Sequence, residues 1–362
     1  MVIRNLSVSH FRNFSQLGTE FSSDINIFHG RNGSGKTNLL EAVFVLCLGR
    51  SQRGAPDALL LKQGEEVYRL EGTVEAGGQT GNIAVAYQKG SRKKVTVDEV
   101  PVRMAELYER FCAVSSGPED SAILSGPPSV RRGFIDIYLS QISGKYLANL
   151  ADYQRALAQK NAALKQEMDP APFDPLLITI GTRIMTARLD FIKALRELAV
   201  KHYNDISGGE SLRMKYEPSV PLSSEEDTPD EIETAFQLKL EDRFLRERAA
   251  QTALVGPHRD ELYFEINDFP ARTHGSQGQW RTAAISLKLA MYDLLKERRG
   301  TAPVLLLDEI FAELDTGRTT GLIDSFAGFS QLFLTTAVEP PEHLMERGRS
   351  YRIHNGMIED IR

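Results

Sequence analysis

The chain has 362 residues, of which 41% are hydrophobic, and a formal net charge of −6 at pH 7. This length suits two domains, or one domain with a large insertion, and the negative charge argues against a surface coated in positive charge for non-specific nucleic-acid binding. No apolar stretch reaches the roughly 18 residues that a membrane helix needs, and the first residues lack a secretion signal, so we expect a cytoplasmic protein.

The first predicted elements are strands over residues 2–10 and 20–28, then a glycine-rich loop and a helix over 37–48. The loop consists of Gly30, Arg31, Asn32, Gly33, Ser34, Gly35, Lys36 and Thr37. Its glycines leave backbone N–H groups open to phosphates, Lys36 adds a positive charge near the β- and γ-phosphates, and Thr37 offers a hydroxyl to Mg²⁺. The helix directs its positive dipole end at the same anion. The sequence therefore predicts a site for a Mg²⁺-bound nucleoside triphosphate.

The middle of the chain changes from strands to helices. Alternating runs separated by glycine-containing turns predict antiparallel hairpins, over residues 68–75, 82–88 and 93–98. Apolar residues spaced by three and four then predict helices, over residues 130–168, 175–205 and 231–251. An acidic, proline-containing segment, 217–230, is expected to be an exposed loop between helices.

The strand pattern resumes at Leu254, after the helices. We therefore expect the nucleotide-binding core to be split in sequence. Residues 1–115 and 252–362 would form this core, and residues 116–251 would form a mainly helical insertion as a second lobe.

Another nucleotide-site signal is a buried-strand pattern at 304–307 that ends in Asp308 and Glu309. Parallel sheets place polar residues at the carboxyl ends of their strands, where ligands bind. We expect Asp308 to hold Mg²⁺ together with Thr37, and Glu309 to polarise the water that attacks the γ-phosphate. With Lys36, these are the predicted catalytic residues. Taken alone, the run is also typical of a core strand followed by an acidic turn.

A predicted helix follows Ser276, Gln277, Gly278 and Gln279. Ser276 can cap this helix while Gln279, three residues on, reaches back in a capping box. A serine-capped helix start that contains glycine is also an anion site. These four residues are therefore further candidates for contacts to the triphosphate.

The three motifs, in this order and with an insertion between the first two, resemble the ATP-binding-cassette (ABC) ATPases. The resemblance implies an α/β fold, an ABC-type P-loop ATPase head with a mainly helical inserted second lobe. It also implies that Ser276–Gln279 is the signature motif, and that Glu313-Leu314-Asp315 is the loop that crosses a dimer interface through Asp315. In that family two heads enclose two ATP molecules, each between the phosphate loop of one head and the signature helix of the other. An ATP-dependent homodimer is therefore expected.

Further segments along nearly the whole chain resemble the RecF family of bacterial recombination mediators, an SMC-like branch. These segments are Phe11–Phe14, Pro118–Asp120, Arg131–Asp136, Gln159–Asn161, Gly256–Asp260 and Ser276–Arg281. The resemblance implies weak, DNA-stimulated ATP hydrolysis and recognition of single-stranded gaps and their junctions with duplex DNA. It also implies help in loading RecA, with RecR and RecO as partners and no membrane, in DNA repair, replication and the SOS response.

Several positions depart from the ABC pattern. No glutamine occurs between Val95 and Ser140, where many ABC ATPases carry one, and Thr335-Thr336-Ala337 stands where transporters usually carry a histidine. Trp280 replaces an expected glutamine. For His258, a hydrogen-bonded turn residue and a direct catalytic role both stay open.

Two other functions share parts of this pattern: the ATPase subunit of an ABC transporter and an SMC-like architectural ATPase. The second would need long heptad arms, and the predicted insertion is short and interrupted by prolines. DNA binding has to be local, given the net charge. Its candidate basic clusters are Arg92–Lys94, Arg131–Arg132, and Arg243 with Arg246 and Arg248, although a solvated helix or hairpin face explains each equally well.

Overall fold

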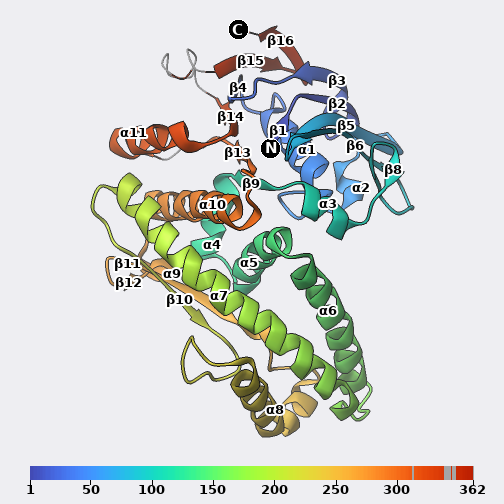
Figure 1. The fold of residues 1–362 in the computed structure, drawn as a ribbon, viewed down its shortest axis with the longest axis vertical. Coiled ribbons are helices and arrows are strands. Elements are labelled where there is room, and N and C mark those ends of the chain that lie inside the picture. Colours follow the sequence, from blue (N-terminus) through green and yellow to red (C-terminus); the bar gives the residue numbers. More distant parts are fainter. Residues whose placement is uncertain (312–313, 338–343, 345–347, 362) are drawn as a thin grey trace. The chain divides into compact units, whose positions relative to one another are not determined.

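The computed structural model describes residues 1–311, 314–337, 344 and 348–361. The chain divides into two compact units (Figure 1). Unit 1 comprises Met1–Asp120, Asp205–Gly208 and Ala284–Arg362, and unit 2 comprises Ser121–Asn204 and Gly209–Ala283. In Figure 1, unit 1 contains the blue and red ends of the chain and unit 2 the green and yellow middle. None of the described helices is long and apolar enough to cross a membrane.

Unit 1 contains a sheet of the order β16-β15-β4-β14-β13-β9. Its strands are β4 (Ile25–His29), β9 (Ala113–Ser116), β13 (Val304–Leu307), β14 (Gln331–Thr336), β15 (Gly348–His354) and β16 (Met357–Ile361). Neighbours from β15 to β9 pair in parallel, and β16 is antiparallel to β15. Strands β9, β13 and β14 are buried along their whole length. This explains their continuous apolar runs, because both faces of a parallel sheet are covered.

A second, antiparallel sheet in unit 1 has the order β3-β2-β5-β6-β7-β8, with β1 paired to β5. Its strands are β1 (Val2–Ile3), β2 (Asn5–Phe11), β3 (Phe14–Glu20), β5 (Val67–Ala76), β6 (Gln79–Gln88), β7 (Lys94–Val97) and β8 (Val100–Pro101). The predicted strand over 20–28 is confirmed only from Ile25 onward, because β3 ends at Glu20 and β4 begins at Ile25. Asn26 causes this turn, since its Oδ1 accepts from the Ser22 amide at 2.8 Å.

Helix α1 (Lys36–Leu48) packs against strands of both sheets. Its residues from Leu39 to Leu48 are all buried. Except for Glu41, which pairs with Arg12 at 2.8 Å, these residues are apolar, and a helix that is apolar on every side belongs in a core. Burial on every side therefore explains the sequence pattern that follows the glycine-rich loop of residues 30–37, which we call the phosphate loop. Other helices of unit 1 are α2 (Asp57–Leu60), α3 (Met104–Arg110), α11 (Thr316–Ser325) and the part of α10 (Gln277–Arg299) that begins at Ala284.

Unit 2 is mainly helical, with α4 (Ala122–Ser125), α5 (Pro128–Ile142), α6 (Gly144–Lys165), α7 (Asp174–Ser207), α8 (Pro229–Ala250), α9 (Ala271–His274) and the first part of α10 (Gln277–Arg299). The single helix predicted over 130–168 is interrupted at Ser143, whose hydroxyl accepts from the Tyr146 amide at 3.2 Å and caps α6. The segment 217–230 joins a strand to α8, not two helices.

The division differs from the predicted lobes at residues 252–283. A small antiparallel sheet, β10 (Leu212–Glu217), β11 (Glu261–Ile266) and β12 (Phe269–Pro270), pairs β10 with β11 over their full length. This pairing places the segment in unit 2, so the second boundary lies after Ala283 instead of after residue 251. Alternation of apolar and polar residues predicts a strand but does not determine which sheet the strand joins.

A buried polar network fills the centre of unit 2. Arg188, which is 1% exposed, donates to Asp260 Oδ2 at 3.1 Å and to Asp136 Oδ1 at 2.8 Å. Burial raises the pKa of Asp260, and this effect is opposed by Arg188 and by the Tyr216 hydroxyl, which donates to the same carboxylate. A buried charge needs such partners, because an unpaired one costs several kcal/mol. The network therefore fixes the Gly256–Asp260 segment that the RecF-like pattern singled out.

Candidate nucleotide site

The phosphate loop connects β4 to α1 and is held by close backbone contacts. Gly30 has φ of +150°, and a Cβ there would lie 2.3 Å from the Ile353 carbonyl oxygen. Gly35 has φ of +112°, and a Cβ there would lie 2.6 Å from Asn13 Nδ2. Side chains are excluded at both positions, so the loop backbone stays bare on these sides. The Ser34 hydroxyl is buried without a hydrogen-bond partner among the described residues, which leaves it available to an anion in the loop.

Lys36 is 4% exposed, and its ammonium lies inside the loop. It donates to the carbonyls of Gly30 at 2.8 Å and Arg31 at 3.2 Å. The third contact is to Glu309 Oε1 at 3.0 Å. The structure thus brings together two predicted catalytic residues from opposite ends of the chain.

Asp308 follows β13 directly and is 3% exposed. Its Oδ1 accepts from the Thr37 hydroxyl at 2.9 Å and from the Thr335 hydroxyl at 2.6 Å. Burial raises the pKa of this carboxyl group, and the two hydroxyl donors oppose the rise. A carboxylate beside a threonine hydroxyl is a hard oxygen pair of the kind that Mg²⁺ prefers.

The described residues contain no group of three or more His, Cys, Asp or Glu side chains that could hold a metal ion. Mg²⁺ is usually held by one or two carboxylates together with water and substrate phosphates instead of a cage of protein ligands. Asp308 and Thr37 are therefore the residues that would hold the ion here.

Glu309 has a left-handed backbone, with φ of +47°. This conformation costs a non-glycine residue about 1 kcal/mol. Two bonds from the end of β14 hold it: the Glu309 amide donates to the Thr335 hydroxyl at 2.9 Å, and the Ala337 amide donates to Glu309 Oε2 at 3.0 Å. Such strain, maintained by surrounding contacts, is typical of functional positions.

Besides Thr335, the side chains of Asn13, Arg53 and Glu119 lie at this site and were not among the predicted site residues. Asn13 accepts from Asn38 Nδ2 at 2.8 Å and donates to the Ser34 carbonyl at 3.4 Å, which braces the loop. Arg53 Nε lies 3.2 Å from Glu119 Oε1, and its Nη2 lies 3.9 Å from Asp308 Oδ2. The RecF-like segments contained Asn13 and Glu119, but no sequence signal marked Arg53, which follows α1 in a loop.

The predicted signature residues lie at the start of α10, in unit 2, whereas the phosphate loop lies in unit 1. The capping box is present: the Ser276 amide donates to Gln279 Oε1 at 2.9 Å, and the Gln279 amide donates to Ser276 Oγ at 3.2 Å. Ser276 and Gln277 are exposed. Trp280 Nε1 donates to the Ala271 carbonyl at 2.6 Å, so the residue that replaces a glutamine ties α9 to α10.

The predicted dimer-crossing residue, Asp315, caps α11 by accepting from the Arg318 amide at 2.9 Å. Its carboxylate is 66% exposed and also lies 3.2 Å from Arg318 Nε. Leu314 belongs to the described residues, whereas Glu313, the first residue of the predicted loop, lies outside them.

His258 is a hydrogen-bonded turn residue within unit 2. The Tyr153 hydroxyl and His258 Nδ1 are 2.8 Å apart, and His258 Nε2 lies 3.2 Å from the Ala253 carbonyl. The ring therefore donates through Nε2 and accepts through Nδ1. Burial lowers the pKa of His258 to about 4.

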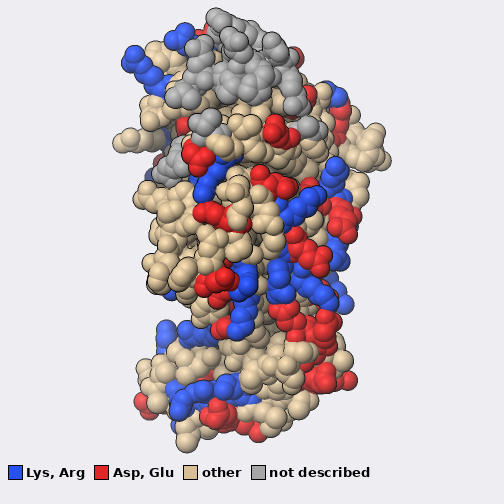
Figure 2. Space-filling model, turned by 90° about the vertical axis from the view of Figure 1, so that its left-hand side faces the viewer, with Lys and Arg blue, Asp and Glu red and all other residues tan. Residues whose placement is uncertain are grey.

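Both residues of the Arg131–Arg132 cluster, and Lys93 of the Arg92–Lys94 cluster, are engaged within their own units. Lys93 binds Asp57 at 2.8 Å in unit 1. In unit 2, Arg131 binds Glu261 at 2.6 Å and Arg132 donates to the Asp260 carbonyl at 2.8 Å. Figure 2 shows Lys and Arg interspersed with Asp and Glu on the face that it draws. A continuous basic surface is not formed by the described residues on that face.

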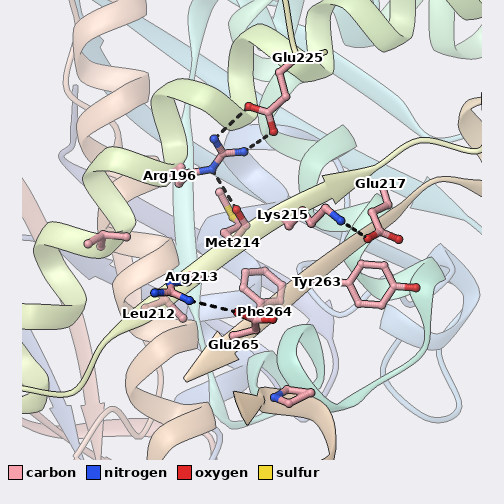
Figure 3. Close-up of a pocket in the computed structure, with 12 residues that line it drawn as sticks. Arg196, Leu212, Arg213, Met214, Lys215, Glu217, Glu225, Tyr263, Phe264 and Glu265 are labelled. Atoms are coloured by element: carbon pink, nitrogen blue, oxygen red, sulfur yellow. Dashed lines mark hydrogen bonds and ion pairs between the residues drawn. The ribbon is translucent and has the colours of Figure 1, made fainter. Parts of the chain in front are cut away.

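Unit 2 also contains a pocket of about 740 Å³ between the end of α7 and the β10–β12 sheet (Figure 3). Its charged side chains pair with one another or with a neighbour: Arg196 with Glu225 at 2.6 Å, Lys215 with Glu217 at 2.7 Å, and Arg213 with Asp268 at 2.6 Å. Such pairing leaves little charge to recognise a ligand, so the phosphate loop remains the better candidate site.

The fold and the phosphate-loop site define an α/β, ABC-type P-loop ATPase head of the SMC-like class. The chain matches the RecF/RecN/SMC N terminal domain family over residues 2–355. The DNA replication and repair protein RecF of Latilactobacillus sakei is 35% identical over 99% of this chain and 98% of its own. RecF of Lachnoclostridium phytofermentans is 36% identical over 99% of both. The chain belongs to the RecF family.

Solved structures agree with this assignment. A structure of the recombination mediator protein RecF with ATP, from the RecFOR pathway, has a TM-score of 0.91 and 30% identity, and the match covers 99% of this chain and 97% of that one. An Smc head domain from Pyrococcus furiosus has a TM-score of 0.57 and 16% identity, which shows the shared fold alone.

Proposed function

We propose that the protein is a cytoplasmic, ATP-dependent DNA-binding recombination mediator, with weak ATPase activity that DNA stimulates. The observation that carries the proposal is the convergence of Lys36, Thr37, Asp308 and Glu309 at the carboxyl edge of one parallel sheet. Family membership supports the DNA-repair role, since the relatives named above are DNA replication and repair proteins and one was solved with ATP.

In the proposed mechanism, the phosphate loop binds ATP through its backbone N–H groups, the Ser34 hydroxyl and the Lys36 ammonium. Mg²⁺, when bound, would neutralise phosphate charge next to Thr37 and Asp308. Lys36, which contacts Glu309 in the structure, would turn to the phosphates. Glu309 would then be free of this partner and would accept a proton from the water that attacks the γ-phosphate.

ATP would also join two copies of the chain. The exposed start of α10, with Ser276, Gln277, Gly278 and Gln279, offers a capped helix N-terminus that suits the γ-phosphate held by a second copy. Asp315 would lie in the loop that crosses the interface. The closed, ATP-bound dimer would bind DNA at single-stranded gaps and their junctions with duplex DNA, and ATP hydrolysis would release the DNA. RecR and RecO would be the partners with which the closed dimer helps to load RecA.

Sedimentation with a gapped DNA, ATP and Mg²⁺ tests the proposal. We expect dimers on DNA with ATP and monomers with ADP, while Lys36→Met, which removes the phosphate-loop cation, stays monomeric with either nucleotide. A wild-type chain that remains monomeric on DNA at saturating ATP would contradict the clamp.

A further inference from the structure

We infer that Thr335 is a positioning residue that sets both carboxylates of the hydrolytic site, an inference that rests on the proposed ATPase function and extends it. Thr335 is at the end of β14, is 0% exposed, and follows Leu334, which pairs with Leu307 of β13. In parallel strands this register places Thr335 beside the residues that follow β13. Its side chain therefore reaches Asp308 and Glu309.

The hydroxyl of Thr335 is both a hydrogen-bond donor and a hydrogen-bond acceptor. It donates to Asp308 Oδ1 at 2.6 Å and accepts from the Glu309 amide at 2.9 Å. Because Thr37 donates to the same Asp308 oxygen, two hydroxyl donors fix how this carboxylate is turned. Thr335, which lies on the neighbouring strand β14, thus helps to fix the orientation of the Asp308 carboxylate beside Thr37.

The second bond acts on the backbone of Glu309. The φ of +47° is held on its amide side by Thr335, and the Glu309 carboxylate accepts from Ala337, two residues further along the chain. Thr335 thus restrains the backbone of Glu309, while Ala337, just after β14, and Lys36 hold its carboxylate. Without the Thr335 hydroxyl, the Glu309 amide would lose its acceptor and the left-handed conformation would lose a restraint.

The test compares Thr335→Val with Thr335→Ser, because valine keeps the shape and removes the hydroxyl, whereas serine keeps the hydroxyl. With ATP and Mg²⁺, we expect valine to lower kcat about 10- to 100-fold, the size expected for a lost hydrogen bond to a charged group. The ATP dissociation constant, measured by equilibrium binding, should change less than about threefold. Serine should restore kcat to within about threefold of the wild type.

A double-variant cycle separates positioning from general damage. Because Thr335 acts partly through Glu309 and partly through Asp308, adding Thr335→Val to Glu309→Gln should lower single-turnover hydrolysis by a smaller factor than Thr335→Val does in the wild type, since residues that act as one unit are not additive. The matched control is Thr182→Val in unit 2, where a buried threonine hydroxyl has no partner among the described residues. This control should keep wild-type kcat.

Normal kcat in Thr335→Val, an equal defect in Thr335→Ser, or a parallel loss of ATP affinity would overturn the inference. So would full additivity with Glu309→Gln. If thermal unfolding shows that the valine variant does not fold, Thr335→Ala replaces it under the same criteria. The comparison needs ATP and Mg²⁺ alone, so a wild-type chain that fails to bind gapped DNA contradicts the proposed function and leaves this test readable.

Discussion

Glu309 has a strained backbone and contacts both Lys36 and the end of β14. Its chemistry depends on this placement, since a general base must be held within hydrogen-bond reach of its water. The local sequence alone describes an acidic residue after a strand. The role of the Glu309 carboxylate can therefore be tested only with ATP bound.

Glu309→Gln should bind ATP normally and hydrolyse it at least about 100-fold more slowly, because the amide cannot accept the proton of the attacking water. ATP-bound dimers should accumulate on DNA. Turnover and sedimentation measure the two effects, with Glu265→Gln, a half-exposed carboxylate in unit 2, as the matched control. Normal turnover in Glu309→Gln would show that another group is the base.

His258 should make stability depend on pH. Its pKa falls from 6.5 to about 4 on folding, so the unfolded chain takes up a proton first as the pH drops. The neutral ring stabilises the fold above about pH 6.5, and this contribution is lost between about pH 6.5 and 4, by at most about 3 kcal/mol. Urea unfolding of the wild type and His258→Gln across this window measures it. Parallel pH curves for the two proteins would contradict the assignment.

Among the elements, the start of α10 has a sequence pattern that predicts two roles, a helix cap and a contact to the ATP of a second copy. Ser276 and Gln279 form the capping box that the spacing predicts, and both residues are also candidates for contacts to a second copy's ATP. A cap needs only the helix itself. The second role needs another chain, and a mixing experiment separates the two.

Lys36→Met and Ser276→Arg should each abolish ATP hydrolysis alone, one by removing the phosphate-loop cation and the other by blocking the helix start. Mixed in equal amounts, they should recover part of the wild-type activity, at most about half, because only mixed dimers are active and each has one intact composite site out of two. Steady-state turnover of the mixture measures this. No recovery, while circular dichroism shows that both variants are folded, would argue against sites shared between copies.

At the scale of the whole molecule, a net charge of −6 restricts where DNA can bind. Most basic residues of two candidate clusters already pair inside their units, and Arg246 and Arg248 of α8 are exposed. Local contacts to phosphates should still release counterions.

We therefore expect the affinity for gapped DNA, with ATP bound, to fall about 10-fold or more between about 50 and 200 mM salt, with little dependence on base sequence. Fluorescence anisotropy with two gapped DNAs of unrelated sequence measures both properties. An affinity that does not depend on salt would exclude a binding mode based on contacts to the DNA phosphates.

Patterns of neighbouring residues were sufficient to predict the glycine-rich loop between β4 and α1, the strand that ends in Asp308, the cap at Ser276 and the helix α8. In each case the physical cause lies within a few residues: glycine conformations, a buried run, a capping side chain, helical spacing. The resemblance to the RecF family had the same basis, since it rested on short segments that can be read in order.

Only the tertiary structure decided which distant residues meet. Strand β11 joins β10 in unit 2, Arg131 and Arg132 turn inward to Glu261 and Asp260, and Arg53 approaches Asp308. Thr335 read as the end of a strand until the parallel register of β13 and β14 placed its hydroxyl between Asp308 and Glu309. Alternation and charge specify that a side chain is buried or exposed, whereas its partner is fixed by strand order and register, which no local segment contains.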